Sequence, residues 1–460
     1  MGDDRSVAEP SSTGETKRLS LGRLIAFALP AVPAAAIDTP LSVYAPPFYA
    51  GQMGLGLGLV GQLFFISGIA EILIGMGAGA ISDRWGGVVR RRRFWMVLAT
   101  PIVVLAIWRL FAPPANVDGA YLLIWMLVLI VGAVLLQVNH TAWGSEITAD
   151  YHERTRVQGA RQMFGVAGLV LILVAPVLIE RAHLGDPERL RMNSVAWFTL
   201  LVMPAAVALA VFLAPERRSA TTQPPPRRVG EALRAMARSH PLRMLLLIDL
   251  LDAAALGVVT RMFVFLSDDV WGLGRVTSIM LLCYLVSGLI CLGPILRLAR
   301  GRSKHRAAAM IALCLTAALP LIALVPHGGT GWAIACMVLL GAPSAVNSAL
   351  FDSMMGDVAA FDAAAGGARV RTGLFYSLHI IMGRLGRALA IAVCYAILDR
   401  IGFHTHMTNA PGVLTGFKLL YVVPPMLLQL AMAALLWRFP LDQAAHDAAR
   451  VSAQQGQTAV

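Results

Sequence analysis

The sequence has little charge for its length. Asp, Glu, Lys and Arg make up 14% of its 460 residues and 57% are hydrophobic, whereas a soluble domain carries about 25% charged residues. The first twenty residues are polar and lack the apolar core of a cleavable signal peptide. We therefore expect a membrane protein whose first apolar segment, starting near Leu24, itself directs insertion.

Cysteine and enzyme motifs are also scarce. The five cysteines all lie in long apolar segments, without the paired spacing of a metal site or a disulfide framework. Neither a His-Glu-x-x-His zinc motif nor a Gly-x-Ser-x-Gly nucleophile motif occurs. We expect a protein that is not an enzyme and that holds no metal or cofactor apart from a coupling ion.

What the chain has in abundance is long apolar runs. A helix needs about 20 apolar residues to span a bilayer, and the runs between charged or Pro/Gly breaks predict twelve such spans. Their expected limits are 22–46, 55–81, 94–112, 119–143, 159–180, 194–214, 242–266, 275–298, 307–325, 331–355, 372–398 and 413–438.

The spans fall into two sets of six. A polar, arginine-containing segment with three consecutive prolines, 215–241, reads as a cytoplasmic linker between a first bundle, 22–214, and a second bundle, 242–438. Residues 1–21 and 439–460 are the expected tails. Met53-Gly54-Leu55-Gly56 is echoed 218 residues later by Trp271-Gly272-Leu273-Gly274. The predicted fold class is an all-α membrane protein of two six-helix repeats, the major facilitator architecture.

The formal net charge of +12 could indicate nucleic-acid binding, but the basic residues lie in short loops between apolar spans. Most of them lie on alternate loops, which the positive-inside rule explains better. We therefore expect no nucleic-acid partner. We expect a monomer in the lipid bilayer of the inner (cytoplasmic) membrane, with both termini cytoplasmic.

Two features of the second span indicate function. Glu71 lies inside the apolar run, and a carboxylate there is by default a functional-site hypothesis. The run ends in Ser82-Asp83-Arg84 and a cluster of arginines. Asp83 and Arg84 are predicted to form a gate between the bundles; the alternative is that they cap the helix in solvent.

Several motifs resemble one family, the glycoside–pentoside–hexuronide:cation symporters of the melibiose-permease type. The resemblance covers nearly all of residues 22–440. Its motifs are specific for the family, but they are poor indicators of the substrate. The motifs are Tyr44–Ala50, Ser82-Asp83-Arg84 with Arg91–Trp95, Ala142–Glu146, Asp150–Arg156 and Gly373–Leu378.

The resemblance also assigns site residues. Where sodium-coupled members carry two acids in span two, this chain has Glu71 and Gly75. An acid of span four falls on Gln137, an arginine of span five on Arg161, and a lysine of span eleven on Arg384. Because a sodium site needs several oxygen ligands, the lost acids favour H⁺ over Na⁺ as the coupling ion at Glu71. The alternative is a permanent ion pair between Glu71 and Arg384.

Two further acids are candidate substrate groups. Asp38 lies between Pro33 and Pro40, which are expected to break the first span there. Its alternative role is to pair with an arginine. Asp252 is near the middle of span seven and is expected to face the cavity or to join an ion-pair lattice in the second half.

Arg384, near the middle of span eleven, should pair with Asp38, Glu71 or an anionic substrate such as a uronate, because an uncompensated guanidinium at this depth is costly. Together these residues predict a secondary transporter that couples a cation, H⁺ rather than Na⁺, to symport of a sugar, glycoside or hexuronate. The alternative is a transporter of the same fold for a lysolipid or another small organic solute.

Overall fold

The computed structural model describes residues 19–85, 91–148, 151–182, 187–215, 239–299, 303–364, 372–405 and 407–440, and all long elements of this part are helices. In the first half they are α1 (Leu21–Ala28), α2 (Ala31–Val43), α3 (Ala45–Pro47), α4 (Leu57–Trp85), α5 (Arg91–Phe111), α6 (Gly119–Glu146), α7 (Tyr151–Ala182) and α8 (Pro187–Leu213). In the second half they are α10 (His240–Phe265), α11 (Thr277–Ala299), α12 (Lys304–Ala323), α13 (Thr330–Ala364), α14 (Thr372–Arg400) and α15 (Pro411–Trp437).

Each of the twelve expected spans falls on one long helix, or on the α1–α2 pair. Ten of these segments are long and apolar enough to cross a membrane. The other two are α10 and α13. Helix α10 carries two aspartates and two arginines along its length. In α13 the apolar stretch found among the described residues is Thr330–Ser344, which is shorter than a membrane span. The predicted all-α membrane fold is confirmed.

The break in the first span lies elsewhere than expected. Helix α1 ends at Ala28 and α2 begins at Ala31, so the chain bends at Leu29 and Pro30. Proline has no backbone N–H to continue a helix, which accounts for the bend. Helix α2 then runs without interruption through Pro40. Asp38 therefore projects from a continuous helix and not from a broken one.

The sequence echo is a structural repeat. A π-helical turn follows the first span at Phe48–Gln52 (η1), and another follows α10 at Leu266–Val270 (η2), 218 residues later. Gly54 and Gly272 each follow their turn with a positive φ, 71° and 68°, which glycine adopts at little cost. The residue after each glycine donates its backbone N–H to a carbonyl of the turn. Leu55 donates to Tyr49 at 3.1 Å, and Leu273 donates to Ser267 at 2.7 Å.

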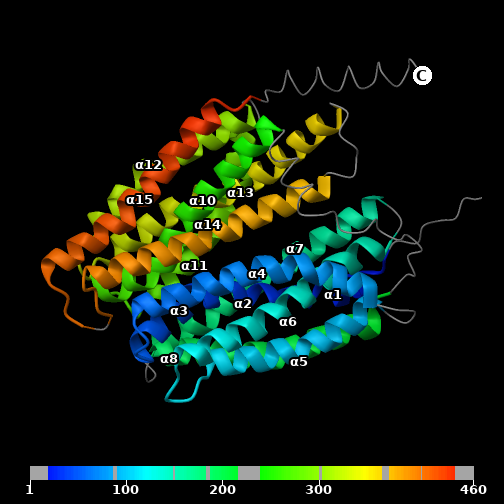
Figure 1. Ribbon diagram of the computed structural model, residues 1–460, viewed down its shortest axis with the longest axis horizontal. Helices are drawn as coiled ribbons and strands as arrows, with labels where there is room; N and C mark the ends of the chain where they lie inside the picture. Colours follow the sequence, from blue (N-terminus) through cyan, green and yellow to red (C-terminus); the bar gives the residue numbers. More distant parts are fainter. Residues whose placement is uncertain are drawn as a thin grey trace, which may run out of the picture.

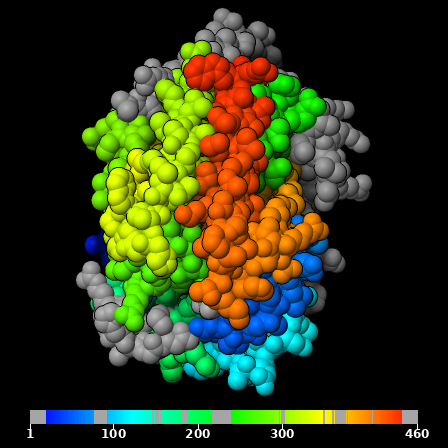
Figure 2. Space-filling view, turned by 90° about the vertical axis from the view of Figure 1, so that its left-hand side faces the viewer, coloured from blue at the N-terminus to red at the C-terminus, as the bar shows by residue number. Residues whose placement is uncertain are grey.

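Figure 1 shows the helices of the two halves as two groups that run side by side. Across the boundary α4 packs on α14, α7 on α11 and α2 on α10. In Figure 2 the end of α14 and the loop after it (orange) lie against the start of α4 (blue). The outward faces carry exposed large apolar side chains such as Phe212, Leu324 and Trp332, as expected for helices that face lipid.

Candidate functional site

An ion pair joins the two halves where α4 faces α14. Arg384 Nη1 lies 3.2 Å from Glu71 Oε1 and donates to the Glu71 backbone carbonyl at 3.5 Å. A Cβ on Gly75, one turn along α4, would lie 3.5 Å from the same nitrogen. The position where the family resemblance implies a second acid thus leaves room for the guanidinium. Glu71 as the partner of Arg384, one of the partners predicted from the sequence, is confirmed.

A second arginine, Arg261 of α10, reaches into the same region. Its Nη1 donates to the backbone carbonyl of Ser42 at 2.9 Å, and its guanidinium lies 5.9 Å from the centre of the Phe64 ring. Arg261 therefore also crosses from the second half to the first. Asp38 of α2 interacts electrostatically with both Arg261 and Glu71, so this carboxylate belongs to the cluster.

A third arginine, Arg387, completes the cluster and was not among the residues selected from the sequence. It lies three residues after Arg384, so the two share one face of α14, and it interacts with the charges of Glu71 and Arg261. Within the described residues Arg387 makes no hydrogen bond or ion pair. The spacing of two arginines within an apolar span was the signal that could have revealed it.

The cluster between the halves carries more positive than negative charge. Arginines from α10 and α14 face the two carboxylates of α2 and α4. A guanidinium presents a planar set of donors that matches a carboxylate or another oxyanion. The site can therefore hold an anion, and its carboxylates can accept bonds from hydroxyl groups of the same molecule.

Two other predicted site residues lie in the first half without a contact to this cluster among the described residues. The Arg161 Nε donates to Gln158 Oε1 at 2.9 Å, so the arginine is engaged within α7. Gln137 lies on α6 with an exposed side chain. A role of either residue in substrate binding stays a prediction.

Asp252 lies in a different place. It lines a small cavity of about 60 Å³ whose walls come from α10, α11, α12, α13 and α15. All of these helices belong to the second half, so the cavity lies inside that bundle and not between the halves. This location differs from the expected one facing the central cavity.

The predicted gate lies at the other end of α4. Asp83 and Arg84 fall in the last turn of that helix, but their side chains lie outside the described residues. Their gating role stays a prediction.

The halves are in close contact where α4 begins and α14 ends. A Cβ added to Gly61 would lie 2.7 Å from Tyr395 Cβ, and one added to Gly68 would lie 2.9 Å from Ala388 Cβ. Real Cβ atoms do not approach this closely, so both positions require glycine for the observed packing. The α4–α14 contact is tight from this end to the Glu71–Arg384 pair.

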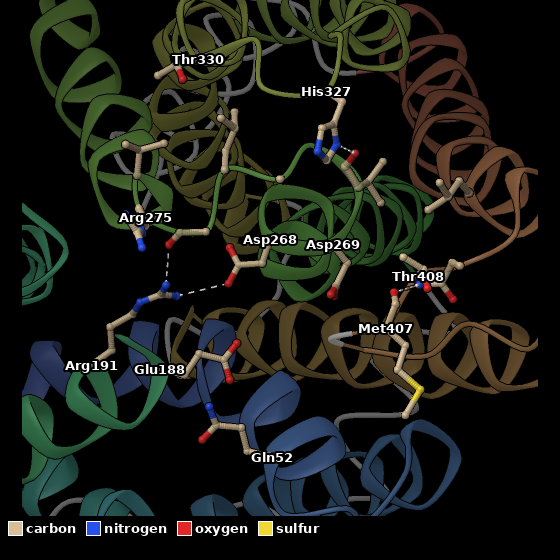
Figure 3. A pocket seen from close by; sticks show the side chains of 17 residues that line it. Gln52, Glu188, Arg191, Asp268, Asp269, Arg275, His327, Thr330, Met407 and Thr408 are labelled. Carbon is tan, nitrogen blue, oxygen red and sulfur yellow. Dashed lines mark hydrogen bonds and ion pairs between the residues drawn. The ribbon is translucent and has the colours of Figure 1, made fainter. Parts of the chain in front are cut away.

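A buried ion pair reinforces the same end and was missed in the sequence. Arg191 of α8 lies 3.5 Å from Asp268 of η2 and donates to the Gly274 carbonyl at 2.6 Å (Figure 3). Both side chains are almost fully buried. They line a pocket of about 880 Å³ between α8, η2 and the loops that precede α13 and α15. The sequence repeat at Trp271–Gly274 indicated this part of the second half, but it did not indicate Arg191, which comes from the first half.

The fold and the central cluster define a class, the secondary transporters of the major facilitator superfamily. Comparison with known families gives the same result: residues 26–443 match the family described as MFS/sugar transport protein. The chain belongs to this family. It is therefore a multi-pass membrane transporter and not an enzyme.

Curated relatives are distant. The chain is 23% identical over 415 residues, 87% of this chain and 88% of the relative, to an Escherichia coli K12 protein provisionally named as a 2,3-dihydroxypropane-1-sulfonate exporter. A protein of the same provisional name from Salmonella typhimurium LT2 is 25% identical over 199 residues, 42% of this chain and 43% of its own length.

Solved structures show the same fold. The nucleoside transporter NupG superposes with a TM-score of 0.67 at 13% identity, covering 92% of this chain and all of NupG. A bacterial homologue of the human lysosomal transporter Spinster, in an inward-facing and unoccupied conformation, gives a TM-score of 0.60 at 14% identity, covering 95% and 97% of the two chains.

Proposed function

We propose that this transporter carries a small hydroxylated organic anion by alternating access, in symport with protons. The substrate class comprises hexuronates and short hydroxylated sulfonates, which share an oxyanion and neighbouring hydroxyl groups. The anion would lie between the halves, at the arginine-rich cluster formed by α2, α4, α10 and α14.

The observation that carries the proposal is the charge balance of this cluster. Between the halves, three arginines, Arg261, Arg384 and Arg387, interact with two carboxylates, Asp38 and Glu71. The charge of Arg387 also acts on Asp252 of the second bundle. An uncompensated guanidinium inside a membrane is costly. An anionic substrate balances the charge, and the carboxylates then orient its hydroxyl groups. A neutral sugar would leave the positive charge in place, and a lysolipid would require an apolar wall here.

The named relatives agree with this class, since their provisional substrate is a dihydroxylated sulfonate. The resemblance to hexuronide symporters points to a carboxylate instead. Both anions present two or more oxygens to a guanidinium, so the shared chemistry supports the class without deciding between its members.

Proton coupling is supported by what surrounds Glu71. Gly75 stands where the family resemblance implies a second acid, and a Cβ there would lie 3.5 Å from Arg384 Nη1. A single carboxyl group is enough to take up and release a proton. Breaking its pair with Arg384 would free the guanidinium for the substrate.

The test is ligand-induced thermal stabilisation of the purified protein. Hexuronates, 2,3-dihydroxypropane-1-sulfonate, the matching neutral sugars and a lysolipid are titrated separately. A ligand at a hundred times its dissociation constant stabilises by about 2.7 kcal/mol, so one or more hydroxylated anions should raise the unfolding temperature and their neutral counterparts should not. Stabilisation by neutral sugars or by the lysolipid alone would refute the anion class.

A further inference from the structure

Polar side chains interrupt the mainly apolar wall of the cavity inside the second bundle. Asp252 lines it together with Asn347 of α13 and Gln429 of α15. Both amide side chains are buried, Asn347 to 2% exposure. The amide oxygens of Asn347 and Gln429 have no hydrogen-bond partner within the described residues. Both amide groups lie close enough to the Asp252 carboxyl to act on it as side-chain hydrogen-bond donors.

Unpartnered buried polar atoms are costly and rare in folded proteins. A cavity of about 60 Å³ lined by such atoms has room for ordered water, which needs roughly 10–15 Å³ and two to four polar partners. The polar part of this cavity, beside the Asp252 carboxyl, therefore has room and partners for ordered water.

A line of titratable side chains leads from this cavity to the protein surface. Asp249 lies three residues before Asp252 on the same helix face; its Oδ1 is buried without a partner, and its Oδ2 lies 2.7 Å from His379 Nδ1 of α14. The other ring nitrogen, His379 Nε2, lies 3.3 Å from Asp352 of α13. The Asp352 side chain is 59% exposed. The imidazole thus joins a buried acid to an accessible one.

The charged groups around Asp252 are few. Helix α14 presents Arg387, whose charge acts on Asp252, and α10 itself presents Asp249. The other lining elements present uncharged groups among the described residues: Tyr284 of α11, leucines of α12, Ser344 and Asn347 of α13, and Gln429 of α15.

We propose that Asp252 is a protonation site inside the second bundle, separate from Glu71 and supplied with protons through Asp352, His379 and Asp249. A proton arriving at Asp352 passes to His379 Nε2 while the Nδ1 proton passes to Asp249. It then reaches Asp252 through cavity water. One proton enters, one carboxylate is neutralised, and the imidazole returns to its starting tautomer between transfers.

The position of Arg387 gives this site a role in coupling. When Asp252 is ionised, its charge partly compensates Arg387. When Asp252 is protonated, this part of the compensation is lost, and the charge of Arg387 attracts an anion to the cluster between the halves more strongly. This coupling step rests on the proposed anion transport. The protonation site does not rest on it.

The site is tested without substrate, by infrared difference spectroscopy of the reconstituted protein during a pH titration. The band of protonated carboxyl groups should include a component that disappears in Asp252→Asn. The component should persist in Glu71→Gln and in Asp357→Asn. Asp357 is a carboxylate of the same bundle that lies 2.6 Å from Lys304, outside the relay.

Two further variants keep the test decisive if Asp252→Asn folds poorly. Asn347→Leu should shift the frequency of the component without removing it. His379→Gln should slow its response to a pH jump at least tenfold while the final amplitude stays the same. An unchanged band in Asp252→Asn overturns the site. Removal of the component by Na⁺ at constant pH also overturns it, and an unchanged rate in His379→Gln overturns the relay.

Failure of the anion proposal would look different. If the Asp252 component is present and no anion stabilises the protein, the protonation site stands and the proposed function falls. If anions stabilise the protein and the Asp252 component is missing, the proposed function stands and the protonation site falls.

Discussion

Glu71 Oε1 and Arg384 Nη1 are 3.2 Å apart and join the two halves of the molecule between α4 and α14. The two side chains keep 37% and 19% of their surface exposed. The pair therefore lies at the boundary between the halves and not deep within one bundle. At this position the two side chains can separate when one half moves against the other.

Replacing Glu71 by Gln should destabilise the protein because it leaves the Arg384 guanidinium without its partner. Removing one member of a buried pair costs about 3–5 kcal/mol, and the exposure of this pair lowers the expected loss to about 1–2 kcal/mol. The double variant Glu71→Gln/Arg384→Gln should recover part of the loss. Thermal unfolding of the two single variants and the double variant measures this; equal or greater loss in the double variant contradicts the pairing.

Replacing Arg387 by Gln should weaken binding of the anionic ligand about tenfold or more, since a charge-assisted hydrogen bond contributes about 1.5–3 kcal/mol. The matched control is Arg400→Gln, which removes an exposed arginine at the end of the same helix and should leave affinity unchanged. Isothermal calorimetry with whichever anion stabilises the protein gives both values. Equal affinities in the two variants would remove Arg387 from the site.

Gly68→Leu should force the halves apart at the end where they now meet. Its side chain would meet Ala388, whose Cβ would already be 2.9 Å from a bare Cβ. Spin labels on Gln52 and Thr408, one on each half, should therefore report a longer distance distribution. Gly293→Leu is the control, because a Cβ there meets nothing within 4 Å; if both variants give the same distribution as the parent, the α4–α14 contact does not hold this end closed.

Asp268→Asn should open the same end by breaking the pair with Arg191. The substitution destabilises the closed arrangement, because the buried Arg191 guanidinium loses its counter-charge there. The same pair of spin labels should show a larger open population, and Asp268→Asn/Arg191→Gln should show less opening than Asp268→Asn alone. Additive opening in the double variant would mean that the two residues act independently.

Apolar length and repeat spacing were enough to predict the fold. The twelve runs needed only local composition, and the Gly-x-Gly echo identified two turns that have the same π-helical backbone. Glu71 and Arg384 were also predictable, because a charge in an apolar span must find a counter-charge. The bend at Pro30 was misplaced because several prolines compete in that span, and sequence does not reveal which one the packing uses.

Other parts of the site depend on tertiary structure. The Arg191–Asp268 pair joins elements from different halves, and no local sequence pattern at either residue predicts this contact. The cavity around Asp252 takes Asn347 and Gln429 from two other helices, so its polar character could not be read from α10 alone. The spacing of Arg384 and Arg387 could have singled out Arg387, but its interactions with the charges of Glu71 and Arg261 involve other helices and needed the structure.

Transport into proteoliposomes under imposed gradients tests the central claim most directly. A hexuronate, 2,3-dihydroxypropane-1-sulfonate and a neutral sugar are supplied with either a proton gradient or a sodium gradient at constant pH. We expect a hydroxylated anion to accumulate with the proton gradient alone, and this accumulation to be lost in Glu71→Gln. Accumulation driven by sodium, accumulation of the neutral sugar alone, or undiminished proton-driven accumulation in Glu71→Gln would contradict the account.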